Sequence, residues 1–323
     1  MGELLKGKVA VVTGSGQGIG RSIAIGMAAE GARVVTNNRR RGSTGYVHLN
    51  EKILKTMSPK QKEWLRQQEA ETVGDAETTA ATIKEAGGEA VAFFGDISDF
   101  DTVKKLIETA VESFGSIDIL ANVAGTFGFS NLWEMSEELW DKVTLTKPKG
   151  YFNCIRHAIP YMMKQKWGRI LNCASRAYLG DVLKHAEYCA ANAGVVGLTR
   201  AVAKELAGYG ITCNAFAPFA RTRAAYELAA YDEAATEAES PWMDRKFAFA
   251  LEMTPSPDDI APFLNYLASD EAANINGRTF NVGGSMINLY SEPDMERTLV
   301  KYGGRWTIDE LRQQVPFGLL PPE

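Results

Sequence analysis

The sequence has few of the features that mark metalloproteins, membrane proteins or secreted proteins. Its cysteines are not spaced as metal ligands, and no apolar run approaches the roughly 18–20 residues that span a bilayer. The N-terminus has no apolar stretch of signal-peptide length, so we expect a soluble, cytoplasmic protein. In that reducing compartment the cysteines should be free, buried thiols. They are Cys154, Cys173, Cys189 and Cys213.

The sequence also has little excess of charge. A net charge of -5 gives no reason to expect nucleic acid or an anionic membrane as a partner. The 323 residues are 45% hydrophobic, which is enough to bury a large core. We find no repeat and no low-complexity linker, so we predict one domain over residues 1–323.

Apolar runs typical of buried strands alternate with longer helical patterns along the chain. Such alternation favours a parallel sheet that is covered by helices on both faces. We therefore predict an α/β fold, a Rossmann-type doubly wound seven-stranded parallel sheet in three α/β/α layers. A ligand would bind at the carboxyl ends of the strands. The predicted strands are residues 8–12, 32–36, 90–94, 117–121, 169–173, 211–216 and 278–282.

Three segments interrupt or follow this alternation. A basic insert at about 40–73 contains Ser58 and Pro59 in a helix-start pattern, so we predict a short helix from Pro59 to about Glu71. An acidic, alanine-rich segment at about 221–254 is either a lid or ordinary packing. A C-terminal tail at about 286–323 contains a capped short helix near residues 306–311.

A glycine-rich turn follows the first predicted strand and opens a helix. Its glycines let the backbone turn tightly and approach a pyrophosphate, which would lie at the positive end of the helix. A glycine-rich turn without a ligand is the alternative, and the six strand–helix units that follow disfavour it. The predicted cofactor-binding residues here are Gly14, Ser15, Gln17, Gly18, Ile19 and Gly20, within the run from Thr13 to Gly20.

The spacing of this turn resembles that of the classical short-chain dehydrogenases/reductases. Further motifs match the family in order over about Leu5 to Ser285, and Ser175 lies thirteen residues before Tyr188, as in the family's catalytic pair. The sequences around Asn37 and Phe219 resemble the hydroxyacyl-CoA dehydrogenase domains of multifunctional enzymes. The other matching motifs are Asn122-Val123-Ala124-Gly125, Asn214-Ala215-Phe216-Ala217-Pro218 and Asn281-Val282-Gly283-Gly284.

The resemblance implies an NAD(P)-dependent oxidoreductase that acts on CH–OH and C=O groups. In the family the serine polarises the substrate oxygen and the tyrosine transfers the proton, roles that fall to Ser175 and Tyr188. It also implies a homodimer or homotetramer, paired through the helices that contain Tyr161 and residues 195–206. The further cofactor contacts that it implies are Asp96, Ile97, Asn122, Ala124, Gly125, Tyr188, Asn192, Pro218 and Thr222.

Two positions depart from the family. The lysine expected four residues after the tyrosine is Asn192, and the asparagine expected one helix earlier is Lys147. Pro148 disfavours helical geometry at Lys147, so we predict a helix break there. Either the cation has moved to Lys147, which would act on Tyr188 while Asn192 holds the cofactor ribose, or the active site has decayed.

The residues after the second strand favour NADP(H) over NAD(H). An acidic residue there would bind the ribose hydroxyls of NAD and repel a 2′-phosphate. This chain has Asn38 followed by Arg39 and Arg40, and an arginine side chain can bind a phosphate group through two parallel hydrogen bonds. The alternative is that these arginines only solvate the insert.

The leading hypothesis is hydride transfer between NADP(H) and a ketone or secondary alcohol, with a hydroxyacyl-CoA-like or cyclic substrate. The alternatives are a non-catalytic dinucleotide-binding subunit of an assembly, and a cofactor-assisted lyase or dehydratase. Phe219, where the family has glycine, either narrows the pocket or packs in the core. Arg176 binds an anionic substrate or forms a structural ion pair, His157 and His185 are interpreted as structural, and we predict no metal site.

Overall fold

A single mixed sheet organises the chain. The computed structural model describes residues 2–42, 54–55, 57–70, 72–182, 184–227 and 254–319. Within these ranges eight strands form one sheet in the order β3-β2-β1-β4-β5-β6-β7-β8. The strands are β1 (Val9–Val12), β2 (Arg33–Asn38), β3 (Ala90–Phe94), β4 (Ile119–Asn122), β5 (Gly168–Cys173), β6 (Ile211–Pro218), β7 (Thr279–Gly283) and β8 (Met286–Leu289).

The seven predicted strands are all present and pair in parallel, which confirms the predicted fold class. The eighth strand is additional. It pairs antiparallel with β7 after a turn in which Gly284 has a φ of +57°, a conformation that glycine adopts readily. The side chains of β8 are exposed, so its residues lack the signature of a buried strand and were expected to belong to the C-terminal tail.

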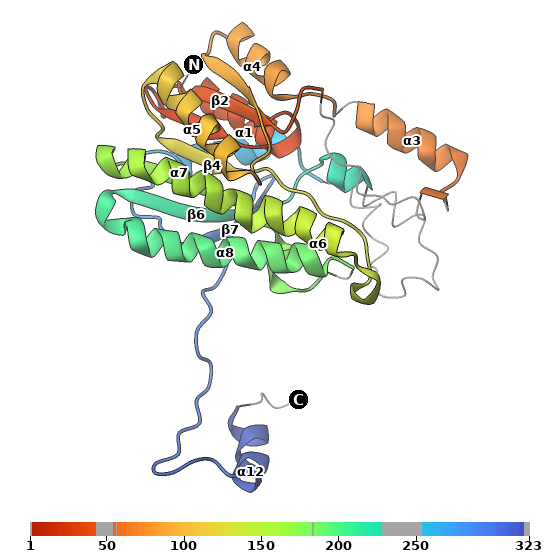
Figure 1. Cartoon of the computed structure of the whole chain (residues 1–323), viewed down its shortest axis with the longest axis vertical. Helices are drawn as coiled ribbons and strands as arrows, with labels where there is room; N and C mark the ends of the chain where they lie inside the picture. The colour runs from red at the N-terminus through yellow and green to blue at the C-terminus, as the bar shows by residue number, and fades with distance from the viewer. Residues whose placement is uncertain are drawn as a thin grey trace. The chain divides into compact units, whose positions relative to one another are not determined.

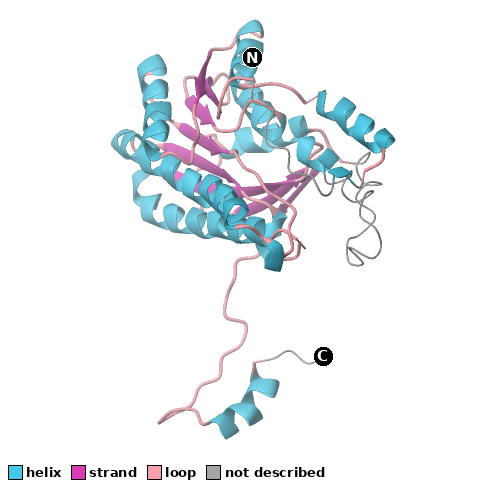
Figure 2. Cartoon of the chain, turned by 45° about the vertical axis from the view of Figure 1, so that its right-hand side comes forward, coloured by secondary structure: helices cyan, strands magenta, loops and turns pink. Residues whose placement is uncertain are grey.

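Helices cover both faces of the sheet (Figures 1 and 2). Successive residues of β1 point to opposite faces, Val9 and Val11 into one core and Ala10 and Val12 into the other. The Ala10 face is covered by α1 (Gly18–Ala29), α4 (Ala76–Glu85) and α11 (Ala261–Leu267). The Val9 face is covered by α5 (Phe100–Phe114), α7 (Gly150–Gln165) and α8 (Ala186–Leu206).

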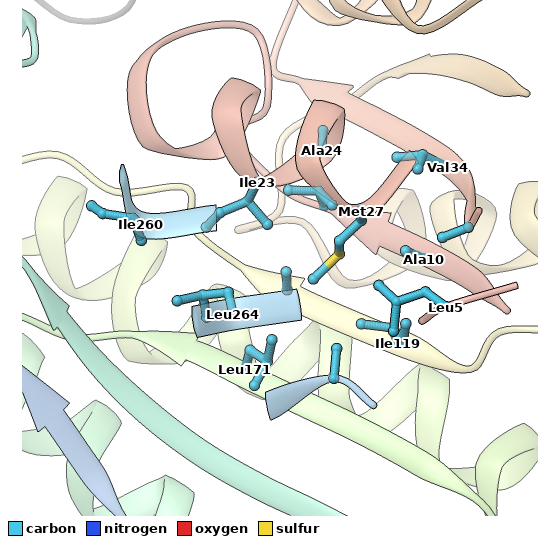
Figure 3. Packing of buried hydrophobic residues seen from close by; sticks show 14 of the residues in the cluster. Leu5, Ala10, Ile23, Ala24, Met27, Val34, Ile119, Leu171, Ile260 and Leu264 are labelled. Carbon is cyan, nitrogen blue, oxygen red and sulfur yellow. The ribbon is translucent and has the colours of Figure 1, made fainter. Parts of the chain in front are cut away.

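The core beneath α1 holds the glycine-rich turn against the sheet. Ile23 and Met27 of α1 are fully buried and point toward Leu264 of α11 and Leu171 of β5 (Figure 3). The chain crosses from one side of β1 to the other between β3 and β4, so β2 and β4 both flank β1. This reversal of strand order marks the place where open α/β sheets bind ligands.

The basic insert contains α3 (Pro59–Ala70), which confirms the helix predicted there. The helix contacts the segment that follows β6: the Trp64 and Tyr226 rings meet edge to face with centroids 6.1 Å apart. Glu69 lies 3.3 Å from Arg223, which also pairs with the fully buried Glu227 at 3.0 Å. Residues 228–253 of the predicted lid lie outside the described residues.

Residues Tyr290–Glu323 form a second compact unit, separate from Met1–Leu289. Its helix α12 (Ile308–Gly318) begins with a capping box between Thr307 and Glu310, as predicted. The Lys301 ammonium, 2.6 Å from Glu310, is the main cause that lowers the pKa of this carboxyl to about 2. Among the described residues, no helix is long and apolar enough to cross a membrane.

Candidate active site

The glycine-rich turn packs directly on the loop that follows β4. Gly14 has a φ of +64°, and a Cβ atom there would lie 2.7 Å from the Ala124 Cα atom. The Thr13 hydroxyl accepts hydrogen bonds from the backbone N–H groups of Val123 (3.0 Å) and Ala124 (3.2 Å). The two loops that are predicted to bind the cofactor therefore form one rigid floor, and Thr13 is a residue of this floor that the sequence analysis did not single out.

The start of α1 is suited to an anion. Gln17, at the N-cap, donates its side-chain amide to the Gly74 carbonyl (3.2 Å) and makes no side-chain cap to the helix. The first-turn N–H groups of α1 are thus left for a phosphate. The Ser15 hydroxyl is used internally, since it accepts a hydrogen bond from the Asn37 N–H of β2 (2.8 Å). Thr222 packs over Gly18 at the same end of the crevice.

The residues at the end of β2 occupy the position expected for the adenosine end of a cofactor. Asn38 Oδ1 lies against Gly16. Burial, and after it the charge of Arg39, lowers the pKa of Lys142, so Arg39 lies within electrostatic range of the helix α6 (Glu137–Thr144). Arg40 is exposed, whereas Arg41 is paired with Glu77 (3.3 Å) and lies 4.7 Å from the centre of the Phe94 ring.

The loops after β3 and β4 complete the crevice. The Asp96 carboxylate accepts hydrogen bonds from the N–H (2.9 Å) and hydroxyl (2.8 Å) of Ser98, and Ile97 beside it is buried. Asn122 donates to the Asn172 side chain of β5 (2.9 Å), which ties the two strands together at their carboxyl ends. Gly125 follows on the same loop, and Pro218 ends β6.

Several polar atoms that line these loops have no partner within the described part of the chain. They are three buried oxygens: Asn38 Oδ1, Asn122 Oδ1 and Thr126 Oγ1. Buried polar atoms are normally hydrogen-bonded, so orphans grouped along one crevice are consistent with a polar ligand. Together with the glycine floor, these residues fit a dinucleotide.

Lys147 interrupts a long helix, as predicted. Its backbone is extended (φ -135°, ψ 131°) within the wide turn Leu145–Lys149 that joins α6 to α7. Its ammonium group, on a residue that is only 2% exposed, donates to the Cys173 carbonyl at 2.6 Å and to Asn192 Oδ1 at 3.4 Å. It also lies 5.9 Å from the centre of the Tyr188 ring. The structure therefore brings together Lys147, Tyr188 and Asn192.

Asn192 is fully buried, and both ends of its amide are engaged. Its nitrogen donates to the Tyr188 carbonyl one helical turn earlier (2.8 Å), while its oxygen accepts from Lys147. Ser175 follows β5 two residues after the carbonyl that binds Lys147, and its hydroxyl accepts from the Ala177 N–H (3.2 Å). The Lys147 side chain also packs against Gly125, where a Cβ atom would lie 2.7 Å from Lys147 Cε.

Two features beside Tyr188 were not predicted. The Phe127 ring, from the loop after β4, has its centroid 5.6 Å from that of Tyr188, and Phe129 and His185 pack behind it. Glu187 is fully buried although it lies next to Tyr188 in the chain. A carboxylate placed directly before the tyrosine, and phenylalanines on either side of Gly128, were the available signals in the sequence.

The structure bears on the expectations for Arg176, Phe219 and the cysteines. Arg176 is 72% exposed and pairs with Asp181 at 2.8 Å, which is the structural ion pair rather than a contact inside the pocket. Phe219 is 41% exposed, so it is not a core residue. All four cysteines are free, and three are buried while Cys189 is half-buried. Within the described residues, no group of three or more His, Cys, Asp or Glu side chains could hold a metal ion.

The chain matches the profile of the family described as short chain dehydrogenase over residues 8–63 and 67–228. It is 35% identical over 279 residues to the 3-oxoacyl-[acyl-carrier-protein] reductase FabG of Staphylococcus aureus (strain Mu50 / ATCC 700699), covering 86% of this chain and 98% of that protein. It is 33% identical over 315 residues to the hydroxyacyl-CoA dehydrogenase ChsB1 of Mycobacterium tuberculosis (strain ATCC 25618 / H37Rv), covering 95% and 87% respectively.

A solved structure extends the comparison to nearly the whole chain. The crystal structure of a short chain dehydrogenase from Mycobacterium avium superposes with a TM-score of 0.75 at 32% identity, covering 99% of this chain and 98% of that one.

Proposed function

Because the chain belongs to the short-chain dehydrogenase/reductase family, and is thus an NAD(P)-dependent oxidoreductase acting on a CH–OH or C=O group, we propose that it interconverts a ketone and a secondary alcohol with NADP(H). The observation that carries this proposal is the position of the Lys147 ammonium, 5.9 Å from the centre of the Tyr188 ring. A cation beside Tyr188 is what a decayed active site would lack.

The proposed chemistry divides between the cofactor and three side chains. The nicotinamide, when bound, supplies or accepts the hydride. Ser175 polarises the substrate oxygen, and Tyr188 passes a proton to it or takes one from it. The positive charge of Lys147, 5.9 Å from the centre of the Tyr188 ring, would stabilise negative charge that develops on the phenol during proton transfer.

Asn192 has a supporting role in this scheme. An amide stays neutral, so it cannot replace the charge of the lysine that the family has at this position. Its hydrogen bonds to the Lys147 ammonium and to the Tyr188 carbonyl instead fix the position of Lys147 relative to Tyr188. Two neutral oxygens among the described residues bind the Lys147 ammonium, which leaves its third N–H for a ribose hydroxyl or for the reacting centre. Asn192 would therefore support ribose binding through Lys147.

The cofactor preference rests on the end of β2. Asn38 carries no charge that would repel a 2′-phosphate, and Arg39 and Arg40 follow it. We assign the phosphate to Arg39 and Arg40 because they follow Asn38 directly, whereas Arg41 pairs with Glu77 and lies against the Phe94 ring. The phosphate turn from Gly14 to Gly20, with Asp96, Ile97, Asn122, Ala124, Gly125, Pro218 and Thr222, would bind the rest of the cofactor.

The substrate class follows from the relatives. They are named as a reductase of 3-oxoacyl groups on acyl carrier protein and as a hydroxyacyl-CoA dehydrogenase. We propose an acyl-chain or cyclic ketone of the same oxidation level. We also propose a cytoplasmic homodimer or homotetramer that pairs through α7 and α8. Light scattering of a homogeneous 35.3 kDa monomer at micromolar concentration would contradict the oligomer.

A screen of NADPH oxidation by absorbance tests the function. Purified protein is mixed with NADPH and a panel of cyclic ketones and 3-oxoacyl thioesters, and NADPH binding is measured separately by fluorescence. Turnover of at least one class supports the proposal. Tight NADPH binding without turnover in either direction would instead favour a dinucleotide-binding subunit, an outcome consistent with the missing lysine at position 192. Loss of water or carbon–carbon cleavage in the products would indicate a lyase.

A further inference from the structure

Three aromatic side chains form a wall beside Tyr188. Phe127 and Phe129 lie 5.6 Å apart between ring centroids, and His185 lies 4.9 Å from Phe129. All three are at most 9% exposed, while Tyr188 itself is only partly buried. We call Phe127, Phe129 and His185 the aromatic wall. It belongs to two segments: the irregular loop after β4, and the residue that precedes α8.

Glu187 joins these two segments. It lies in the first turn of α8, and its Oε1 accepts a hydrogen bond from the Gly128 N–H at 3.1 Å. Gly128 is the residue between the two phenylalanines, and a Cβ atom there would clash with Leu139 of α6 at 2.5 Å. The loop is therefore pressed between α6 and α8, and the Glu187 bond fixes its middle residue.

The burial of Glu187 sets it apart from an ordinary acidic residue at a helix start. Acidic residues in a first helical turn are normally exposed, where they interact with the helix dipole. Glu187 is 0% exposed, and burial raises the pKa of its carboxyl despite hydrogen bonds from Gly128 and the start of the helix. Its second oxygen has no hydrogen-bond partner among the described residues. Burying a carboxyl group costs free energy unless the group is hydrogen-bonded, and the bond from the Gly128 N–H offsets part of this cost.

We propose that Glu187 is a positioning residue that holds Phe127 and Phe129 as one side of the substrate pocket, and thereby selects carbonyl substrates with a bulky apolar body next to the reacting carbon. The inference rests on the proposed function, because it takes Tyr188 as the group that meets the substrate oxygen. The ring of Phe127 lies against the ring of Tyr188, so a substrate whose oxygen reaches Tyr188 would place its body against the aromatic wall.

The test compares Glu187→Gln, which keeps an acceptor oxygen, with Glu187→Met, which keeps the shape and removes the acceptor. Glu205→Met, at an exposed position of the same helix, is the control. Hydrogen–deuterium exchange of the Gly128 amide should speed up about tenfold in Glu187→Met, as expected for losing one hydrogen bond, and stay unchanged in the other two. The ratio of kcat/KM for 1-decalone to that for butanone should fall by a similar factor in Glu187→Met alone, while NADPH affinity stays unchanged.

The outcomes separate this inference from the proposed function. An unchanged Gly128 exchange rate or an unchanged substrate ratio in Glu187→Met would overturn the inference. Turnover by the wild-type protein in the same experiment would still support the proposed function. Absence of turnover by the wild-type protein across a broad ketone screen would overturn the function, whatever the exchange data show. If Glu187→Met does not fold, Phe129→Leu decides: its 1-decalone to butanone ratio should fall in the same direction, and an unchanged ratio would overturn the inference.

Discussion

The proposed cofactor end of the site is built from backbone turns, whereas the proposed proton-transfer end is built from side chains that come from separate elements. The floor from Thr13 to Gly20 depends on close approach at Gly14 and on the N-terminus of α1. The charge beside Tyr188 comes from Lys147, at a helix break 41 positions earlier, and is held by a carbonyl of β5. A site that is built from backbone turns tolerates few substitutions. A positive charge beside a tyrosine can instead be supplied by a long side chain from more than one helix.

The largest effect is expected from removing the Lys147 side chain at the proposed proton-transfer end. Lys147→Ala should lower kcat on the order of 100-fold, because it removes the positive charge beside Tyr188, and one charge at such a distance is worth ~3 kcal/mol at an effective dielectric constant near 20. Steady-state rates measure the change. Lys149→Ala, two residues away, is the matched control, because Lys149 binds Asn153 rather than the site.

A double variant tests whether lysine and asparagine have exchanged positions between 147 and 192. Lys147→Asn combined with Asn192→Lys restores the arrangement expected from the family and should recover activity that either single change loses. Asn192→Ala alone should mainly weaken cofactor binding, because it releases Lys147 from one of its partners. Full activity in Lys147→Ala would contradict the role of Lys147.

A smaller effect is expected at the cofactor end. Arg39→Glu should reduce the ratio of NADP to NAD affinity about 10- to 150-fold, because losing a charge-assisted hydrogen bond costs about 1.5–3 kcal/mol. Titration of both nucleotides by fluorescence gives the ratio. Arg41→Glu serves as the control, since Arg41 is already paired with Glu77. If both variants change the ratio equally, the effect is one of net charge, and the specific assignment to Arg39 is wrong.

Phe219→Gly should sharpen the description of the pocket with less than about a tenfold effect. The side chain is 41% exposed, and its backbone N–H donates to the Val282 carbonyl (2.8 Å), a bond that glycine keeps. We expect bulky ketones to be reduced faster while small ketones are unaffected. Thermal denaturation controls for stability. An unchanged substrate range would show that Phe219 does not line the pocket.

The smallest effect concerns stability and pH at Glu187. Burial raises the pKa of this carboxyl above its usual value of 4.5, so folding favours the protonated form. The stability that it contributes is fully present below about pH 4.5 and is lost as pH rises through the raised pKa. Glu187→Gln does not ionise, and its neighbours Tyr188 and His185 remain. The Tm of the variant minus that of the wild type should therefore increase from pH 4.5 to 8, and a constant difference would contradict the shift.

The parts of the fold that could be predicted were those with local signals. Strand periodicity gave the seven parallel strands, Pro59 gave the start of α3, and Pro148 gave the break at Lys147, because each depends on residues close together in the chain. The carboxylate of Glu187 before Tyr188 and the ring of Phe127 beside Gly128 are visible in the sequence, but no local pattern predicts that they are buried together. Their burial arises only when the loop after β4 packs on α8, and no single-sequence pattern records a contact between residues some 60 positions apart.

The ion pair between Glu69 and Arg223 has a consequence for the history of the sequence. The two residues are 154 positions apart, yet Arg223 is only 11% exposed at its side chain and also pairs with the buried Glu227. Removing one partner of a buried charge costs about 1–3 kcal/mol. Related chains that carry an insertion like α3 should therefore change positions 69 and 223 together. Chains with a short connection between β2 and α4 have no residue that corresponds to Glu69 and should show no such covariation at position 223.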